Sequence, residues 1–443
     1  MLEKRSKNSL KKAINYIQNI SGKEVNYLNI KLVEKQIIKP SDSRFHQLDD
    51  LCIRAKKLYN RLLYLTRHSL FDGEFRYPSA FEKEVRQDQE YPDYRNMLDM
   101  ASAQQVIRQQ HAVWLSYFRA HADWKKHPDK YTGEPKIPKY IKPDGRYPFT
   151  FTAGLNANYS AILLPSGVFR LPKKFNGLKI QTACYTHPNY QRVNEIKIVS
   201  KKYQIEIFVT YTISIPELKS DNNRYLGIDI GLDNLAACVT NDQKLQPFVI
   251  NGKSLKSINQ YYNKKKSILT SDAKTKHGMY STHRIERLTE IRNRRIADYL
   301  HCASKYIVNY CKIHNINCII VGKNIGWKIS INLGRRTNQN FTYIPHARFI
   351  QMIQYKAQMQ GISVICTEES YTSGTSFLDD ESPTKDKYNI SRRIRRGLFR
   401  SNSGMLINSD INGAHQIIKK VVPTAFKQWD RGHVIGPVRI SFS

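Results

Sequence analysis

One acidic residue interrupts an apolar stretch near the middle of this 443-residue chain. The stretch, Leu226–Thr240, reads LGIDIGLDNLAACVT, so that Asp229 is followed by a glycine-bearing turn and a second apolar run. This pattern predicts a β-hairpin whose first strand carries a single carboxylate. Carboxylate oxygens are the ligands that Mg²⁺ prefers in proteins. Asp229 is therefore the first candidate for a metal-dependent site.

Such a hairpin is typical of the ribonuclease H-like fold, although actin-like and sugar-kinase ATPases open with a very similar segment. A nuclease of this fold needs three or four carboxylates around two Mg²⁺ ions about 4 Å apart. Asp410, in the segment INSDINGA (407–414), precedes a helical pattern and is the second candidate ligand. Taken alone, Asp410 is better explained as a helix cap. The glycine motifs that an ATPase would need later in the chain are not found.

The third carboxylate should follow the apolar strand at 319–321, but the chain has Gly322 there. The next predicted strand ends in Thr367, Glu368 and Glu369. Neighbouring strands lie about 4.8 Å apart, a distance that much of a glutamate side chain can span. A glycine on the intervening strand leaves room for it. We therefore expect Glu369, with Glu368 as second choice, to complete the metal site. The alternative is that both glutamates form an exposed strand end beside an inactive site.

The elements that must position these residues follow from hydrophobic periodicity. Helices are expected at about 44–68, 97–124, 257–276, 282–311, 347–359 and 414–422. Strands are expected at 27–38, 149–152, 161–164, 168–171, 178–182, 192–199, 203–213, 318–321 and 362–366. Together these patterns predict a multidomain α+β protein with a basic N-terminal arm (1–22), a small β-barrel (23–43 and 125–222), a helical insertion (44–124) and a ribonuclease H-like α/β domain (223–443). His415, close to Asp410, is expected on a solvated helix face.

The charge of the chain predicts a polyanionic partner. Seventy-one Lys and Arg residues against thirty-seven Asp and Glu leave a net charge of +34, and each neutralised phosphate releases counterions. Candidate nucleic-acid-binding residues are Arg284, Arg287, Arg292 and Arg295 on the long helix, Lys136 and Lys139 in a Pro- and Gly-rich stretch, and Arg392, Arg393, Arg395 and Arg396 before Asp410. The same residues could instead form a solvated helix face, a linker and a solvated loop.

Membrane spans, zinc ribbons and disulfides are not expected from the sequence. No run of eighteen apolar residues exists, and the Lys-rich N-terminus has no apolar signal core. None of the seven cysteines stands in a C-x2-C or C-x4-C pair. These features predict a cytoplasmic protein with reduced cysteines. They indicate no protein oligomer.

With these residues in view, the chain resembles the TnpB family, transposon-encoded RNA-guided DNA endonucleases related to compact type V CRISPR effectors. The resemblance covers nearly the whole chain beyond the basic arm. It is carried by Leu32–Ile38, Lys57–Asn60, Trp114–Arg119, Gly133–Tyr140, the Asp229 hairpin, Tyr371–Ser373 and Asn408–Ala414. It implies a β-barrel wedge domain with an inserted helical recognition domain, followed by a RuvC-like nuclease domain.

Two departures from the family pattern concern metals. The family's zinc ribbon begins after Thr372-Ser373, but residues 374–405 contain no cysteine, so structural zinc is not expected. The usual second catalytic glutamate is replaced by Gly322. Together, Gly322–Asn324, Trp327-Lys328 and Glu368–Ser373 resemble a branch with a relocated catalytic glutamate.

The resemblance further implies what the chain binds. A transposon-derived, omega-type guide RNA pairs with one strand of a double-stranded DNA target, and the protein reads a short adjacent motif. The nuclease site then cuts by Mg²⁺-dependent phosphodiester hydrolysis, with Asp229, Glu369 and Asp410 as catalytic and metal-binding residues. The main alternative is a nuclease-dead RNA-guided DNA-binding protein that acts as a transcriptional repressor. A guide-free DNA transposase is a further alternative.

Overall fold

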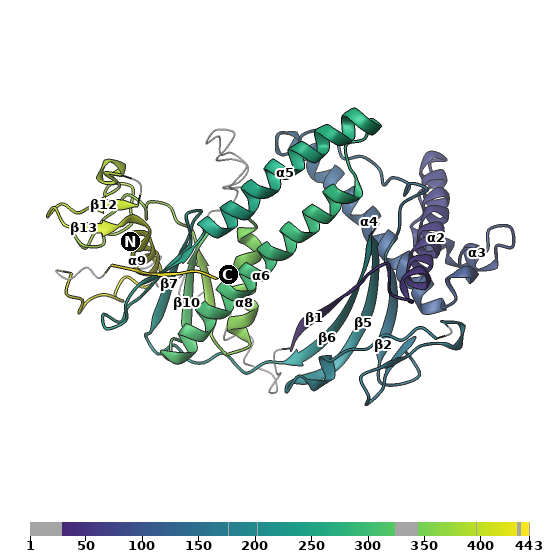
Figure 1. The fold of residues 1–443 in the computed structure, drawn as a ribbon, viewed down its shortest axis with the longest axis horizontal. Coiled ribbons are helices and arrows are strands. Elements are labelled where there is room, and N and C mark those ends of the chain that lie inside the picture. Colours follow the sequence, from purple (N-terminus) through teal and green to yellow (C-terminus); the bar gives the residue numbers. More distant parts are fainter. Residues whose placement is uncertain are drawn as a thin grey trace. The chain divides into compact units, whose positions relative to one another are not determined.

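The computed structural model describes residues 29–443 except 176, 202, 324–343, 396, 432–435 and 443. The predicted N-terminal arm, the Trp327-Lys328 pair and Arg396 therefore lie outside the described residues. The described chain forms two compact units, residues 29–214 and residues 215–443 (Figure 1).

The first unit is built on a six-stranded sheet in the order β1-β6-β5-β2-β3-β4. Its strands are β1 (Asn29–Ile38), β2 (Phe149–Gly154), β3 (Ala161–Leu163), β4 (Phe169–Arg170), β5 (Tyr190–Lys201) and β6 (Gln204–Ser214). The lone strand predicted at 27–38 pairs antiparallel with β6 over its whole length. It thus joins the sheet, as expected for a barrel assembled from both sides of the helical block.

The Glu34 side chain connects β1, at one edge of this sheet, to the segment that lies next to β4 at the other edge. The Glu34 carboxylate accepts hydrogen bonds from Thr182 Oγ1 at 2.6 Å and from the Ala183 amide at 3.0 Å. Gln181 in turn forms an isolated bridge with Val168, next to β4. The strand predicted at 178–182 is therefore reduced to this single bridge, because the segment is tied to β1 by side chains instead of by a ladder.

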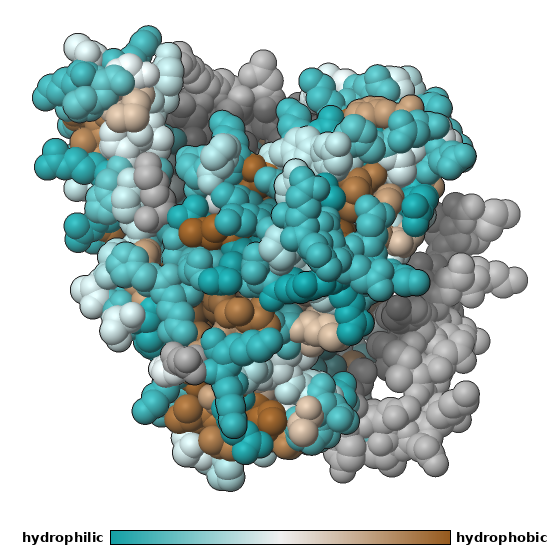
Figure 2. All heavy atoms as spheres, turned by 90° about the vertical axis from the view of Figure 1, so that its right-hand side faces the viewer, coloured by the Kyte–Doolittle hydropathy of each residue, from teal (hydrophilic) through white to brown (hydrophobic). Residues whose placement is uncertain are grey.

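Two long helices of the first unit occupy the predicted helical block. They are α2 (Phe45–Phe71) and α4 (Met100–Lys126). Between them lie η1 (Pro78–Phe81), α3 (Glu82–Gln87) and η2 (Arg95–Met97). Gln110 of α4 donates to the Tyr59 carbonyl of α2 at 2.8 Å, and Trp114 is fully buried. The face shown in Figure 2 is mostly hydrophilic, with apolar side chains in separate patches.

The second unit is an α/β layer structure around a sheet in the order β11-β10-β7-β8-β9-β14. The strands are β7 (Tyr225–Ile230), β8 (Asn234–Thr240), β9 (Phe248–Asn251), β10 (Cys318–Gly322), β11 (Ser363–Thr367) and β14 (Val438–Ile440). β7 and β8 form the predicted hairpin, and β10 lies parallel between β7 and β11. The central parallel strands therefore end at one edge, beside the turn of the hairpin.

Helices cover both faces of this sheet. On one face, α6 (His283–Ile313) and α8 (His346–Gln358) pack on Leu226, Ile228 and Ile230. On the other, α9 (Ser409–Val421) packs on Tyr225 and Ile320 (Figure 1). Helix α5 (Lys253–His277) lies against α6. Because strand residues alternate between faces, Asp229 belongs to the side covered by α9.

The expected solvated position of His415 on α9 is wrong. Its side chain is 3% exposed and stacks on Phe377, with ring centroids 4.0 Å apart and planes at 9°. The reason is that α9 faces the sheet on one side and is covered by residues 375–381 and 426–429 on the other. No helix of the described residues is long and apolar enough to cross a membrane.

Candidate active site

Asp229 lies near the end of β7 and points toward the first turns of α9. A Cβ atom added to Gly413 would lie 2.6 Å from Asp229 Oδ2. Only a glycine at position 413 therefore lets the helix approach this carboxylate so closely. Gly227, two residues earlier on the same face, meets the same helix, because its Cβ would lie 2.6 Å from the Ala414 carbonyl oxygen.

Glu369 reaches the site across Gly322. The paired registers place Val321 beside Ile228 and Gly322 beside Thr367, so Gly322 lies between the Asp229 region of β7 and the end of β11. A Cβ atom at Gly322 would come within 2.6 Å of both Cγ and Oε1 of Glu369. The glutamate side chain thus occupies the space that any larger residue at 322 would fill. This is the arrangement proposed from the sequence.

The backbone after Glu369 holds this side chain in place. Both the amide and the hydroxyl of Thr372 donate to the Glu369 carbonyl, at 3.1 and 2.8 Å. Tyr371 adopts a left-handed conformation with φ of 69°, which costs a non-glycine residue free energy. The turn is therefore held by its own hydrogen bonds in a conformation that aims residue 369 at the pocket.

Asp410 occupies the first turn of α9 but does not cap the helix. The cap is Asn408, whose Oδ1 accepts from the amides of Asp410 and Ile411 at 3.0 and 3.2 Å. The helix-cap explanation for Asp410 is therefore wrong. Its carboxylate instead accepts a 2.7 Å hydrogen bond from Asn234 Nδ2, and Arg393 Nη2 lies 3.8 Å from its Oδ1.

These side chains border one polar cavity of about 220 Å³. Its lining consists of Asp229, Ile230, Gly231, Asn234, Glu369, Thr372, Ser373, Arg393 and Asp410. The three carboxylates predicted as metal ligands therefore share one pocket, although they come from segments up to 181 residues apart, from 229 to 410. Glu368 is exposed and accepts a hydrogen bond from the Ser370 hydroxyl, so it lies outside this lining.

The pocket disfavours negative charge on two of its carboxylates, Asp229 and Glu369. Burial raises the pKa of Asp229 well above its ordinary value, and the charges of Glu369 and Asp410 raise it further, against a smaller opposing effect of Arg393. Burial likewise raises the pKa of Glu369 to about 7, with Lys420 acting in the opposite direction. Such a cluster of like charges favours the binding of a cation.

The donor set fits Mg²⁺. The pocket offers carboxylate oxygens and the amide side chain of Asn234, but no cysteine or histidine. Among the described residues, no three His, Cys, Asp or Glu side chains form a ready-made metal cage. Mg²⁺ in proteins keeps several water ligands and is bound through few carboxylates. Asp229, Glu369 and Asp410 are the residues that would hold it.

The predicted basic residues have diverse environments. Arg284, Arg287 and Arg295 on α6, Lys136, Lys139 and Arg395 are exposed, and their nucleic-acid-binding role stays a prediction. Arg393 lines the carboxylate pocket. Two residues differ from the expectation, because their guanidinium groups are engaged within the protein. Arg292 donates to Asn259 of α5 at 2.8 Å, and Arg392 forms a bidentate ion pair with Glu381.

Asn234 was missed at the level of the sequence. It is the first residue of β8, is 8% exposed, and orients Asp410 through its side-chain amide. Its signal is an amide side chain that immediately follows the turn of the Asp229 hairpin. A contact over 176 residues, however, cannot be read from local spacing.

Two protein families match parts of this chain. The OrfB_IS605 family, described as a probable transposase, matches residues 208–328, and the Cas12f1-like TNB domain family matches residues 346–417. A comparison with curated proteins finds no match.

Among solved structures, the chain is similar to the Cas12f1 chain of a Cas12f1–sgRNA–target DNA complex. The TM-score is 0.54 at 13% identity, over 85% of this chain and 82% of that chain. The mini-RNA-guided endonuclease CRISPR-Cas_phi3 aligns over 95% of each chain at 10% identity, but its TM-score of 0.47 is too low to support an argument. The family matches confirm the predicted TnpB-like relationship. The likeness to Cas12f1 confirms the multidomain α+β fold.

Proposed function

We propose that this TnpB-like chain is an RNA-guided DNA endonuclease of transposon origin. The observation that carries the proposal is the convergence of Asp229, Glu369 and Asp410 on one polar pocket despite the glycine at position 322. A glutamate that reaches over a neighbouring strand restores the acidic character of the site. A decayed site would have no physical reason to keep three carboxylates together at such an electrostatic cost.

The residues of the pocket have distinct tasks in the proposed reaction. Asp229, Glu369 and Asp410 would hold Mg²⁺, whose chemistry there would be Lewis-acid polarisation of a phosphoryl oxygen and activation of water. Asn234 keeps one oxygen of Asp410 occupied and so orients the other, Oδ1, which faces Arg393. The Arg393 guanidinium, partly exposed at the pocket, is placed to contact a phosphate of the DNA backbone.

The proposed partners are a transposon-derived, omega-type guide RNA and a double-stranded DNA target with a short adjacent motif. Base pairing would supply sequence specificity, and the protein would bind the duplexes mainly through their backbones. The net charge of +34 supports this assignment, since phosphate contacts are needed along the whole guide and target.

The test is cleavage of a plasmid library by the purified ribonucleoprotein. The RNA that copurifies with the chain is sequenced, and matching targets flanked by random sequence are incubated with the complex and Mg²⁺. The proposal is supported if the wild-type complex cleaves its target, and if this cleavage is lost both in the Asp229→Asn variant and when the guide RNA is left out. Target binding without any nicking identifies the nuclease-dead repressor instead, and cleavage without RNA identifies a guide-free nuclease.

A further inference from the structure

The segment between β11 and α9 must be held in place by interactions other than a zinc site. Residues 374–405 lie within the part of the chain that matches the TNB domain and contain no cysteine or histidine. A structural zinc site needs four such ligands, so the residues present do not fit zinc. Regular structure in the described part of this segment is limited to η6 (Ile390–Arg392) and β12 (Leu398–Arg400), which pairs with β13 (Leu406–Asn408).

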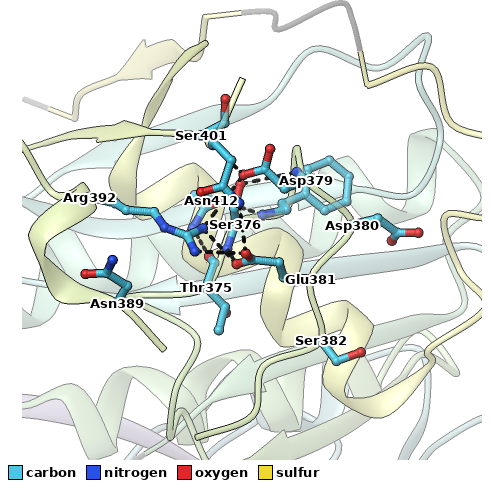
Figure 3. Close-up of polar contacts among 12 residues, drawn as sticks. Thr375, Ser376, Asp379, Asp380, Glu381, Ser382, Asn389, Arg392, Ser401 and Asn412 are labelled. Carbon is cyan, nitrogen blue, oxygen red and sulfur yellow. Dashed lines mark hydrogen bonds and ion pairs between the residues drawn. The ribbon is translucent and has the colours of Figure 1, made fainter. Parts of the chain in front are cut away.

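At the centre of this segment, Arg392 and Glu381 form a partly buried ion pair (Figure 3). Arg392 Nη1 and Nη2 donate to the two carboxylate oxygens of Glu381, both at 2.8 Å, and the side chains are 15% and 10% exposed. Asp379 Oδ2 lies 3.7 Å from the same guanidinium. A bidentate, partly buried pair of this kind is geometrically specific, and removing one partner leaves a poorly solvated charge that destabilises its surroundings.

Hydrogen bonds and ion pairs link four places in the segment around this pair. Glu381 also accepts from the Ser376 amide at 2.7 Å, and Asp379 accepts from the Asn402 amide at 2.8 Å (Figure 3). Residues 376, 379–381, 392 and 402 are thereby tied together without a metal. Because the backbone amides of Ser376 and Asn402 donate two of these hydrogen bonds, the network constrains the backbone of the segment as well as its side chains.

The same network is attached to α9. Asn412, which is fully buried, accepts from the Phe377 amide at 2.9 Å and donates to the Thr375 carbonyl at 2.8 Å. Gln416 donates to the Glu381 carbonyl at 3.1 Å. Asn412 lies two residues after Asp410, so the segment is joined to the turn of α9 that carries the candidate metal ligand.

Arg393 connects this network to the pocket. It directly follows Arg392, and its guanidinium donates to Ser409 Oγ at 3.2 Å while lying 3.8 Å from Asp410 Oδ1. One arginine is therefore anchored inside the segment and the next one borders the carboxylates. We infer that the Glu381–Arg392 ion pair, in place of a structural zinc, holds residues 374–405 on α9 and thereby positions Arg393 beside Asp410. This inference rests on the proposed nuclease function for its effect on cleavage.

The decisive experiment is a double-mutant comparison in the full guide-RNA complex. Single-turnover cleavage and target affinity are measured for wild type, Arg392→Met, Arg393→Gln and the combined variant, with Arg400→Gln on β12 as the control for loss of one exposed arginine. Misplacing a group by about 1 Å can cost roughly 100-fold in rate. We expect Arg392→Met to slow cleavage by ~10- to 100-fold, with target affinity changed much less, and Arg393→Gln to have a similar effect.

The combined variant distinguishes positioning from general destabilisation. If Arg392 acts through Arg393, the double variant is no slower than Arg393→Gln alone. The positioning role is overturned if the rate decreases of the two single variants multiply in the combined variant. It is also overturned if Arg392→Met cleaves at the wild-type rate. A wild-type complex that binds its target and never cleaves it overturns the proposed function instead, and the positioning role with it.

Two measurements test the ion pair without any cleavage assay. Hydrogen exchange at the Ser376 and Phe377 amides should accelerate in Arg392→Met and be partly restored in Glu381→Gln/Arg392→Met, because the double change removes the uncompensated buried carboxylate while keeping an acceptor for Ser376. Elemental analysis of the purified complex should find less zinc than one atom per chain. One zinc per chain, or exchange that is the same in wild type and Arg392→Met, overturns the inference.

Discussion

Each compact unit contains buried carboxylates, but their electrostatic environments differ. In the first unit, Glu206 on β6 is 4% exposed and accepts from Lys35 and Lys201 at 2.7 and 2.6 Å. Burial raises its pKa, but the hydrogen bonds and charges of the two lysines more than offset this, so the pKa of Glu206 lies below its ordinary value. In the second unit, Arg393 and Lys420 do not offset burial, and the pKa values of Asp229 and Glu369 stay raised.

The proposed function accounts for this difference, with Glu206 as a structural carboxylate and Asp229 and Glu369 as metal ligands. A chain with seventy-one Lys and Arg residues has ample means to neutralise a buried acid, as it does at Glu206 and again at Glu381. Under the proposed function, the positive counterpart of Asp229 and Glu369, whose pKa values stay raised, is a metal ion from outside the chain. The following predictions test that contrast, from the largest expected effect to the smallest.

Asp229→Asn should abolish cleavage. The loss of one charged metal ligand removes several kcal/mol of transition-state stabilisation, which corresponds to a decrease of about 1,000-fold or more in rate. The same variant should unfold at a higher temperature than wild type in EDTA, because a repelled, desolvated charge is removed. Single-turnover cleavage and thermal unfolding measure both effects. Retained cleavage would remove Asp229 from the site, and a lower unfolding temperature would contradict the electrostatic contrast.

Glu369→Gln should slow cleavage by roughly 100- to 1,000-fold through the loss of a charged ligand. Its neighbour provides a matched control, since Glu368 is exposed and outside the pocket lining. Glu368→Gln should stay within about threefold of wild type, as expected for a surface position. Parallel cleavage time courses of the two variants decide the assignment. The opposite ranking would show that Glu368 is the ligand.

Gly322→Ala should displace Glu369 and destabilise the second unit. The added methyl group would lie 2.6 Å from Glu369 and from Ile417 Cδ1. Overpacking of this kind typically costs about 1–3 kcal/mol. We expect a lower unfolding temperature together with slower cleavage. Gly436→Ala is the control, because its new Cβ would meet nothing within 4 Å. Equal behaviour of the two alanine variants would show that residue 322 does not need to be glycine.

The metal-free protein should lose stability as the pH rises from about 4.5 to about 7. In this window the folded state keeps a proton on Glu369, whose pKa is about 7, while the unfolded chain, with an ordinary value of 4.5, has released it. The free energy of unfolding then falls with rising pH, by up to about 1.4 kcal/mol per pH unit. Denaturant titrations in EDTA should show this slope, Mg²⁺ should flatten it, and Glu369→Gln should make it shallower, because the raised pKa of Asp229 still contributes. A stability that rises through the window would refute the raised pKa.

Glu206→Gln should have the smallest effect and the opposite sign to Asp229→Asn. It removes ion pairs whose lysine side chains are 45% and 43% exposed, so solvent screening limits the loss to roughly 1 kcal/mol or less. Unfolding should therefore occur at a slightly lower temperature, and cleavage should remain at the wild-type rate. A stabilised Glu206→Gln variant would mean that its lysines do not compensate for burial.

Much of the architecture could be predicted from the chain, and for identifiable reasons. The hairpin at 226–240 and helices such as α6 follow from strand alternation and helical periodicity, which are local properties. The environment of His415 could not be predicted in this way. Helical periodicity predicts which residues of α9 share a face. It does not predict that residues 375–381 and 426–429 cover the face turned away from the sheet, because those segments have no periodic pattern.

The sequence by itself determined most of the long strands, the long helices and the four acidic residues worth considering, and it predicted a polyanionic partner. It also contained the clue of Gly322, because an absent side chain at a strand end leaves space for a neighbour. Only the tertiary structure decided that Glu369 and not Glu368 fills this space, that Asn408 and not Asp410 caps α9, and that Arg392 faces inward while Arg393 borders the pocket. The physical reason is that spacing along the chain sets which residues share a helix or strand. The direction in which a side chain points at the end of a strand or in a turn depends instead on contacts between distant segments.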